Sequence, residues 1–232
     1  GGQRWYHLYP DRKLVAGDPL HWTGIDQNWN YQCAYCHSTN LEKNFDAAAK
    51  AFKSTWSEIS VGCEACHGPA SAHLAWASSQ AGAGSPAKGF AAGFSERRGI
   101  AWSNDAQGRP IRSAPRTTAT EINACAKCHA RRQQFGTGAD LSAHLLDAFR
   151  PSTLQAGLYH TDGQQRDEVY TYGSFVQSRM HAAGVTCSDC HNPHSGKLLK
   201  TGNAVCTQCH LPETFETPSH HHHVNGAAGS AC

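Results

Sequence analysis

The pentapeptide Cys-x-x-Cys-His occurs five times in this chain of 232 residues, and no other feature constrains the fold as strongly. With this spacing, two thiols attach to the vinyl groups of one haem and the adjacent imidazole becomes the proximal ligand of the iron. The sequence therefore predicts five covalent haem c sites. Their residues are Cys33, Cys36, His37, Cys63, Cys66, His67, Cys125, Cys128, His129, Cys187, Cys190, His191, Cys206, Cys209 and His210.

Other uses of paired cysteines fit this pattern less well. A Cys-x-x-Cys pair also occurs in zinc ribbons and in thioredoxin-type redox sites. Zinc ribbons combine such pairs two by two, so five pairs would leave one unmatched. Neither alternative requires a histidine directly after the second cysteine. Ten of the eleven cysteines fall in the five motifs, which favours haem.

The composition leaves little material for an apolar core made of side chains alone. Only 39% of the residues are hydrophobic, and 22 are glycine. Haem macrocycles are large, flat and apolar, so we expect a haem stack to form the core, with folding coupled to haem binding. The expected fold is a multihaem cytochrome c fold that is mainly α, with extensive coil and few short β segments. We expect one domain over residues 1–232.

Local patterns predict a few elements between the motifs. Gly, Ala, Ser and Pro dominate a stretch that is typical of a flexible surface loop, at about residues 80–95. Apolar spacing and breaker residues predict the others. These are a helix with Pro69 in its first turn, a helix from Thr120 through Arg132, a helix over 140–149, and a β-prone segment over 167–176.

The formal net charge of +2 changes sign when haem is included. An oxidised haem with neutral axial ligands contributes about −1, because its two propionates outweigh the iron–porphyrin charge. Five haems would thus bring the chain to about −3. The sequence has no basic run typical of nucleic-acid binding and no apolar run long enough for a membrane span. The expected partners are redox proteins, or further copies of this chain.

The two ends of the chain indicate a fragment of a longer, secreted protein. Haem c is attached outside the cytoplasm, so we expect a periplasmic or extracellular location. The chain begins with Gly1 and shows no initiator methionine and no apolar signal segment. Cys232, the odd cysteine, is expected to begin a sixth haem motif.

Each haem that only passes electrons needs a sixth ligand, and histidine is abundant enough to supply it. Of sixteen histidines, eleven lie outside the motifs. The best placed of them is His194, which follows the proximal His191 by three residues, so that one short segment would serve two neighbouring haems. Another belongs to the internal run at 220–223. The candidate distal ligands are His194, His73, His181, His160, His21 and His223.

Several segments together resemble the multihaem c-type cytochromes of the cytochrome c-554-like superfamily, which is related to the multihaem nitrite reductases. The branch that this chain resembles often carries tetratricopeptide repeats after the haem domain. The resemblance implies a further haem motif upstream and another after the histidine-rich turn. The segments that carry it are Gly17–Trp22, Cys33–Asn40, Val61–Pro69, Tyr172–Phe175 with Met180–His181, and Cys187–His194.

Three functions remain open from the sequence. The first is electron transfer through mostly bis-histidine haems, between redox partners or to an extracellular acceptor. The second is reduction of nitrite, hydroxylamine or a similar small oxyanion. Related nitrite reductases carry a Cys-x-x-Cys-Lys haem, which is absent here, and the surplus of histidines favours a carrier over an enzyme. The third is a subunit of a cytochrome filament.

Overall fold

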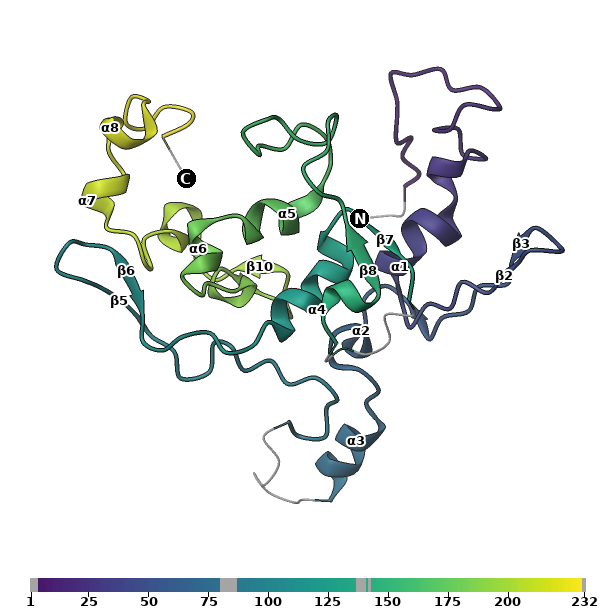
Figure 1. Ribbon diagram of the computed structural model, residues 1–232, viewed down its shortest axis with the longest axis horizontal. Coiled ribbons are helices and arrows are strands. Elements are labelled where there is room, and N and C mark those ends of the chain that lie inside the picture. Colours follow the sequence, from purple (N-terminus) through teal and green to yellow (C-terminus); the bar gives the residue numbers. More distant parts are fainter. Residues whose placement is uncertain (1–3, 80–86, 137–140, 142, 231–232) are drawn as a thin grey trace. The chain divides into compact units, whose positions relative to one another are not determined.

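The computed structural model describes residues 4–79, 87–136, 141 and 143–230. It consists of short helices, two-stranded antiparallel ribbons and connecting turns (Figure 1). The chain divides into two compact units, Gly1–Ala65 and Cys66–Cys232, which are described separately. A single domain over residues 1–232 therefore stays a prediction.

The first unit is organised around the buried pair Ser38 and Thr39, directly after the first haem motif. These residues form β1, and Ser38 pairs with Ile59 of β4. The Thr39 hydroxyl donates to the Ser60 carbonyl at 2.9 Å and accepts from the Gly62 N–H at 2.8 Å. The segment before the second motif is thereby held against the residues after the first. The elements are η1 (Ile25–Gln27), the π-helical η2 (Trp29–Cys33), α1 (Ala34–His37), β1 (Ser38–Thr39), β2 (Phe45–Asp46), β3 (Ala51–Phe52) and β4 (Glu58–Ile59), and α2 (Cys63–His67) crosses into the second unit.

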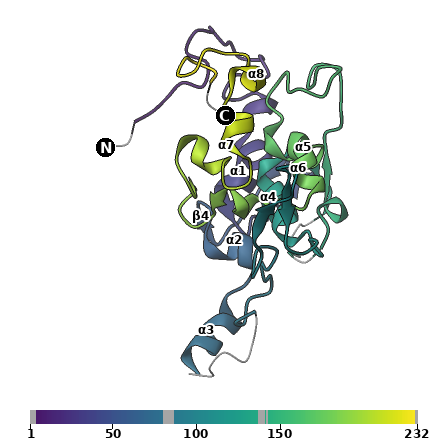
Figure 2. The ribbon, with the colours of Figure 1, turned by 90° about the vertical axis from the view of Figure 1, so that its left-hand side faces the viewer.

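The second unit is built around α4, its longest described helix. Both views show α5 and α6 following each other beside α4 (Figures 1 and 2). The helices and 3-10 turns are α3 (Ser71–Ser78), α4 (Thr120–His129), η3 (Leu145–Asp147), α5 (Tyr170–Val176), α6 (Arg179–Ala182), η4 (Cys187–Asp189), η5 (Gly202–Val205), α7 (Pro212–Phe215) and α8 (Pro218–His221). The ribbons are β5 (Trp102–Asn104) with β6 (Pro110–Arg112), β7 (Arg132–Gln134) with β8 (Phe149–Pro151), and β9 (His191–Asn192) with β10 (Lys197–Leu198).

The apolar interior of the second unit lies where α4 meets η3 and the β7–β8 ribbon. Leu145, Phe149 and Val169 are each 1% exposed. Ile122 and Ala126 face the same interior from α4 and are also buried. Each such side chain contributes about 1.5–3 kcal/mol when it leaves water. This cluster holds the third motif, which forms the end of α4.

Large apolar side chains also lie at the protein surface in the first unit. Trp5, Trp22 and Ile25 are 103%, 79% and 69% exposed, respectively. A chain whose core is completed by a large apolar prosthetic group is expected to have such a surplus of apolar side chains. That the haems form the core stays a prediction.

The predicted helix through Arg132 is wrong at its C-terminal end. α4 ends at His129, and Ala130 is extended with φ −131° and ψ 140°. Arg132 instead opens β7 and pairs with Pro151 of β8. The Arg132 Nε donates to the Lys127 carbonyl at 2.7 Å, so a side chain satisfies one of the carbonyls that the helix end leaves without a partner.

Two further element predictions are also wrong. The apolar spacing over 140–149 predicts a helix, but the described part forms only the single turn η3, after which Phe149 pairs with Gln134 in the β7–β8 ribbon; residues 140 and 142 lie outside the described residues. The β-prone segment over 167–176 is the helix α5 from Tyr170 to Val176. Its packing against α4 outweighs the strand preference of its side chains.

Other expectations agree better with the structure. The helix predicted near Trp76 is present as α3, which begins at Ser71, two residues after Pro69. Residues 87–94 of the predicted loop form turns and bends, while 80–86 lie outside the described residues. The fold is a mixture of short helices, short strands and coil rather than mainly α. Among the described residues, no helix is long and apolar enough to cross a membrane.

Candidate haem-binding sites

Each Cys-x-x-Cys-His motif is folded into a helical turn. The first spans η2 and α1, the second is α2, and the third ends α4. The fourth begins in η4, and the fifth is a turn in which the His210 N–H donates to the Cys206 carbonyl at 3.0 Å. Residues three apart in a helical turn lie on the same side. Both cysteines of each motif can therefore reach one edge of the same macrocycle.

The fourth motif is fixed by the carboxylate of Asp189, one of its variable residues. Asp189 accepts hydrogen bonds from the Thr186 N–H at 2.9 Å and from the Trp102 indole at 3.2 Å. It also forms an ion pair of 3.5 Å with Arg97. The β5 strand and the segment before it thus hold this motif, although they lie about ninety residues earlier in the sequence.

The third and fourth motifs are in direct contact. The Cys125 and Cys187 thiols share a hydrogen bond. This bond and burial raise the pKa of Cys125, whereas the same bond lowers the pKa of Cys187 although burial opposes the decrease. In the same place, the Glu121 carboxylate accepts from the Ser188 N–H at 2.5 Å and from its hydroxyl at 2.8 Å. Cysteines of two different motifs therefore lie side by side.

The fifth motif lies close to the fourth, and the second motif lies close to the third. Burial raises the pKa of Cys190, and the nearby Asp189 and Cys206 add to the increase. Burial likewise raises the pKa of Cys209, with further contributions from Asp189 and Cys190. Cys66 of the second motif is close enough to Cys125 to contribute to its raised pKa. Within the second unit, cysteines of successive motifs are thus neighbours.

The proximal histidine of the second motif lies in an aromatic setting. Its ring centroid is 4.8 Å from that of Phe90 and 5.1 Å from that of Phe94. The ring of His194 lies 6.1 Å away and is nearly parallel, with 9° between the ring planes. Of the candidate distal ligands, His194 is therefore one that the structure brings opposite a proximal histidine.

His73 lies close to the same site, against Phe90. Its ring stacks on Phe90 with centroids 3.9 Å apart and 16° between the planes. Its Nδ1 is 2.8 Å from the Lys88 carbonyl, so a donated hydrogen bond there leaves Nε2 as the available nitrogen. His73 and His67 thus both have Phe90 as a ring neighbour.

His181 lies in α6, against Phe175 and close to Arg116. The centroids of the His181 and Phe175 rings are 5.6 Å apart. The Arg116 guanidinium lies 2.8 Å from Nε2. Burial and this positive charge hold the pKa of His181 below its usual range. A neutral imidazole is the form that binds iron, although the guanidinium occupies the nitrogen in this arrangement.

The remaining candidates lie in turns. His160 is exposed, and its N–H donates to the Gln164 carbonyl at 2.8 Å. The Nδ1 of His21 is 2.8 Å from the Thr23 hydroxyl. His223 follows α8 in the histidine run, and its N–H donates to the Nδ1 of His221 at 3.1 Å.

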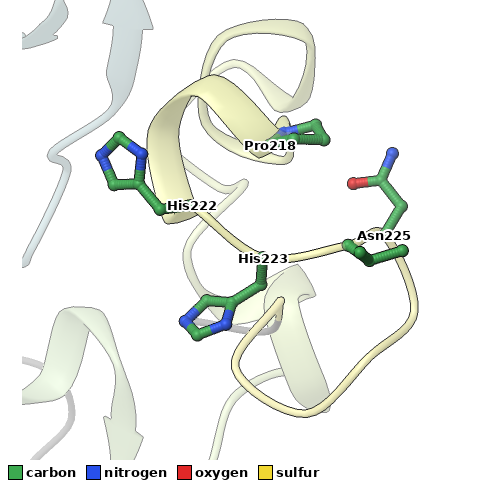
Figure 3. Close-up of a pocket in the computed structure, with 5 residues that line it drawn as sticks. Pro218, His222, His223 and Asn225 are labelled. Atoms are coloured by element: carbon green, nitrogen blue, oxygen red, sulfur yellow. The ribbon is translucent and has the colours of Figure 1, made fainter.

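The histidine run borders a pocket at the end of α8. His222 is the left-handed C-cap of that helix, with φ 58°. Figure 3 shows the imidazoles of His222 and His223 projecting from successive residues, with Pro218 and Asn225 on the other walls. The pocket combines apolar and imidazole surface. Nothing in the described contacts pairs His223 with a proximal histidine.

Sequence reasoning did not identify the side chains that support the motifs. Phe215 lies between His210 and His220, with ring centroids 4.6 Å and 4.9 Å away. Phe90 and Phe94 contact His67 from a stretch that was interpreted only as a loop. For Phe215 the sequence did contain a signal, because this residue follows His210 by only five positions and could be expected to lie near it.

The residues of the second unit fit covalent haem. Paired cysteines lie on helical turns, and the following histidines His67 and His210 have aromatic neighbours suited to the rim of a macrocycle. The Nδ1 atoms of both imidazoles are buried without a hydrogen-bond partner among the described residues. The donor set of two thiols and one imidazole at each site is that of haem c.

Comparison with known proteins supports this assignment in two regions. Residues 11–68 match the family model of cytochrome c554 and c-prime. Residues 180–214, which contain the fourth and fifth motifs, match the model of the doubled CXXCH motif. No curated protein and no solved structure matches the chain.

The motifs and these matches define a multihaem c-type cytochrome, a class of proteins that transfer electrons through covalently bound haem. Within that class, residues 11–68 are similar to the c554-like family.

Proposed function

We propose that this protein relays electrons along a row of closely spaced haems, outside the cytoplasm, between redox partner proteins or to an extracellular acceptor. In the second unit the row follows the chain order of the second, third, fourth and fifth motifs. Most of the irons carry two histidines, so that they pass electrons without binding substrate. The protein fixes the spacing of the haems and tunes each potential through its ligands and surroundings.

The contact between Cys125 and Cys187 is the observation that carries the proposal. Each cysteine is bonded to a vinyl group, which lies at the edge of its macrocycle. Two cysteines that touch therefore bring the edges of two haems together. The hydrogen bonds between Glu121 and Ser188 hold the same two segments in place. An electron can then move from the third haem to the fourth without an intervening carrier.

The proximity of the outer motifs extends this pair into a row. Cys66 lies near Cys125, and Cys190 lies near Cys206 and Cys209. Each motif in the second unit is thus a neighbour of the next one in the sequence. A carrier needs such continuity, whereas a reductase needs an iron with an open position for its substrate.

Spectroscopy of the oxidised protein separates the relay from a reductase. We expect every haem, counted by intact mass, to be low-spin in electron paramagnetic resonance spectra. Adding cyanide or nitrite should leave the Soret band unchanged, and the dithionite-reduced protein should form no ammonium from nitrite. A high-spin signal that shifts with added nitrite, together with nitrite turnover, would favour the reductase.

A further inference from the structure

The rings of His67 and His194 have the separation and relative tilt expected of two ligands on opposite sides of one metal ion. Their centroids are 6.1 Å apart and their planes differ by 9°. An imidazole nitrogen binds a first-row transition metal at about 2 Å, so two nitrogens on opposite sides are about 4 Å apart and the ring centroids about 6 Å apart. Rings in direct stacking contact would lie closer, as His73 and Phe90 do at 3.9 Å. The separation leaves room for a single iron.

His67 is held in this orientation by its aromatic neighbours. Phe94 meets the imidazole edge-on, with 67° between the planes, and Phe90 covers it at 38°. These rings restrict rotation of the side chain. His73 stacks on Phe90 with centroids 3.9 Å apart, so its ring is engaged with that phenyl ring. The ring of His194 is nearly parallel to that of His67 and lies at the distance that a shared iron requires.

His194 is presented by a turn that its own backbone hydrogen bonds define. The Asn192 carboxamide oxygen accepts from the His194 N–H at 3.0 Å and from the Ser195 N–H at 3.2 Å. The Gly196 N–H donates to the Asn192 carbonyl at 2.9 Å, and Gly196 has φ 64°, which favours glycine. This turn joins β9 to β10. The imidazole projects from it, exposed and without a hydrogen bond among the described residues.

The rings of His221 and His223 in the histidine run have the same centroid distance as those of His67 and His194, but there the short stretch of chain between the two residues explains it. His221 and His223 are also 6.1 Å apart, but their planes differ by 23°. They are two residues apart, and the His223 N–H donates to the His221 Nδ1. Neither follows a cysteine pair. The chain itself therefore sets that distance, whereas His67 and His194 are separated by more than a hundred residues.

We propose that His194 is the sixth ligand of the iron whose haem is attached at Cys63 and Cys66. The proposal rests on the proposed function only in taking that iron to be bis-histidine. The segment from His191 to His194 then serves two haems, with His191 on its own iron and His194 on that of the second motif. This coordinate bond joins α2 to the β9–β10 turn and fixes the second haem relative to the fourth.

The first test removes the ligand and reads the spin state of the full holoprotein. His194→Ala should convert one haem equivalent from low spin to high spin, and added imidazole should restore the low-spin spectrum. His194→Met should keep that haem low-spin and raise its potential. His7→Ala, which changes an exposed histidine in the first unit, is the control and should leave the spectrum unchanged. A fully low-spin His194→Ala protein with an unchanged haem count by mass would overturn the proposal.

A double variant tests whether both histidines bind the same iron. The number of high-spin haems in His67→Gly/His194→Ala should equal the number in His67→Gly alone, because one iron loses both ligands. One additional high-spin haem in the double variant would show that His194 binds another iron. This comparison also holds if His67→Gly loses its haem, since both proteins then lack it.

The outcomes also separate this proposal from the relay. A wild-type protein with a nitrite-responsive high-spin haem would contradict the relay of low-spin haems. His194→Ala would still be expected to add one further high-spin equivalent. Conversely, the wild type and the His194→Ala variant could both be entirely low-spin. That result would be consistent with the relay but would disprove the pairing of His194 with His67.

Discussion

The carboxylate of Glu121 binds both the backbone N–H and the hydroxyl of Ser188, at 2.5 Å and 2.8 Å, and so joins the helix of the third haem motif to the turn of the fourth. Glu121 is only 7% exposed. Its own N–H donates to the Glu96 carboxylate at 3.0 Å, which extends the connection to a third segment. This buried network joins the two segments that bring Cys125 and Cys187 together.

Removing the Glu121 carboxylate should therefore destabilise the holoprotein. Glu121→Ala loses both hydrogen bonds and leaves the Ser188 N–H without its acceptor. A buried donor that loses its acceptor costs about 1–3 kcal/mol, and the lost bond to the Ser188 hydroxyl adds about 1 kcal/mol. We expect a loss of about 2–4 kcal/mol in the free energy of unfolding, measured by urea titration followed at the Soret band.

Glu213→Ala is the matched control for this substitution. Glu213 lies in α7 and is exposed, so its removal should change the free energy of unfolding by no more than about 0.5 kcal/mol. Equal urea midpoints for the two variants would show that the bonds between Glu121 and Ser188 do not stabilise the contact of the motifs.

The buried Glu96 carboxyl makes the stability depend on pH. Burial alone would raise its pKa, but hydrogen bonds from the Glu121 N–H, the Thr118 hydroxyl and the Ser95 N–H together hold the pKa below the ordinary value of 4.5. A pKa lowered by folding contributes stability above the unfolded-state pKa, and this contribution disappears as the pH falls through the folded-state pKa. Stability should thus decrease below about pH 4.5.

Urea midpoints measured between pH 7 and pH 3 test this dependence. Glu96→Gln should be less stable than the wild type at pH 7 and should lose less stability on acidification. Glu213→Gln, with an exposed side chain, should retain the wild-type profile. A Glu96→Gln profile parallel to that of the wild type would mean that another group causes the acid sensitivity.

The Cys-x-x-Cys-His motifs could be identified from the sequence because their pattern is local. Five residues contain both thiols and the imidazole that haem c needs, and each motif lies in a helical turn, while haem attachment at these residues stays a prediction. Helix α3 was also predictable, since Pro69 and the residues around Trp76 carry a local signal. The helix predicted through Arg132 failed because Arg132 is used in the β7–β8 ribbon, a long-range pairing.

The side chains that support the motifs were not predictable, because they come from distant parts of the chain. Nothing in the pattern around Phe90 indicates a contact with His67, and nothing around Trp102 indicates a bond to Asp189. His194 was a candidate ligand from its spacing after His191. Its position opposite His67 is visible only in the folded unit.

Haem removal provides a third prediction. If the haems complete the core, the same chain produced without haem attachment should not fold cooperatively. For the haem-free chain we expect weak helical circular dichroism, rapid proteolysis throughout the chain and no sigmoidal urea transition. For the holoprotein we expect strong helical circular dichroism, resistance to proteolysis and a sigmoidal urea transition. Intact mass of the holoprotein should show five haems. A protease-resistant haem-free chain with a cooperative transition would disprove this coupling.

The charge of Asp189 should lower the potential of the fourth haem. Asp189 stands between Cys187 and Cys190 in the sequence, and a negative charge beside a haem stabilises the oxidised iron. Asp189→Asn removes the charge but keeps an oxygen to accept from the Thr186 N–H, so one haem potential should rise by on the order of tens of mV. The ion pair with Arg97 at 3.5 Å offsets part of the charge and limits the shift.

Spectroelectrochemical titration measures this shift in the context of the whole protein. One step of the reduction curve should move to higher potential in Asp189→Asn while the others remain in place, because the effect of a single charge decreases with distance. Asp162→Asn is the control, since it removes an exposed carboxylate from the turn at Gln164. If the Asp189→Asn and wild-type curves superimpose, Asp189 acts through its hydrogen bonds alone and its charge is balanced by Arg97.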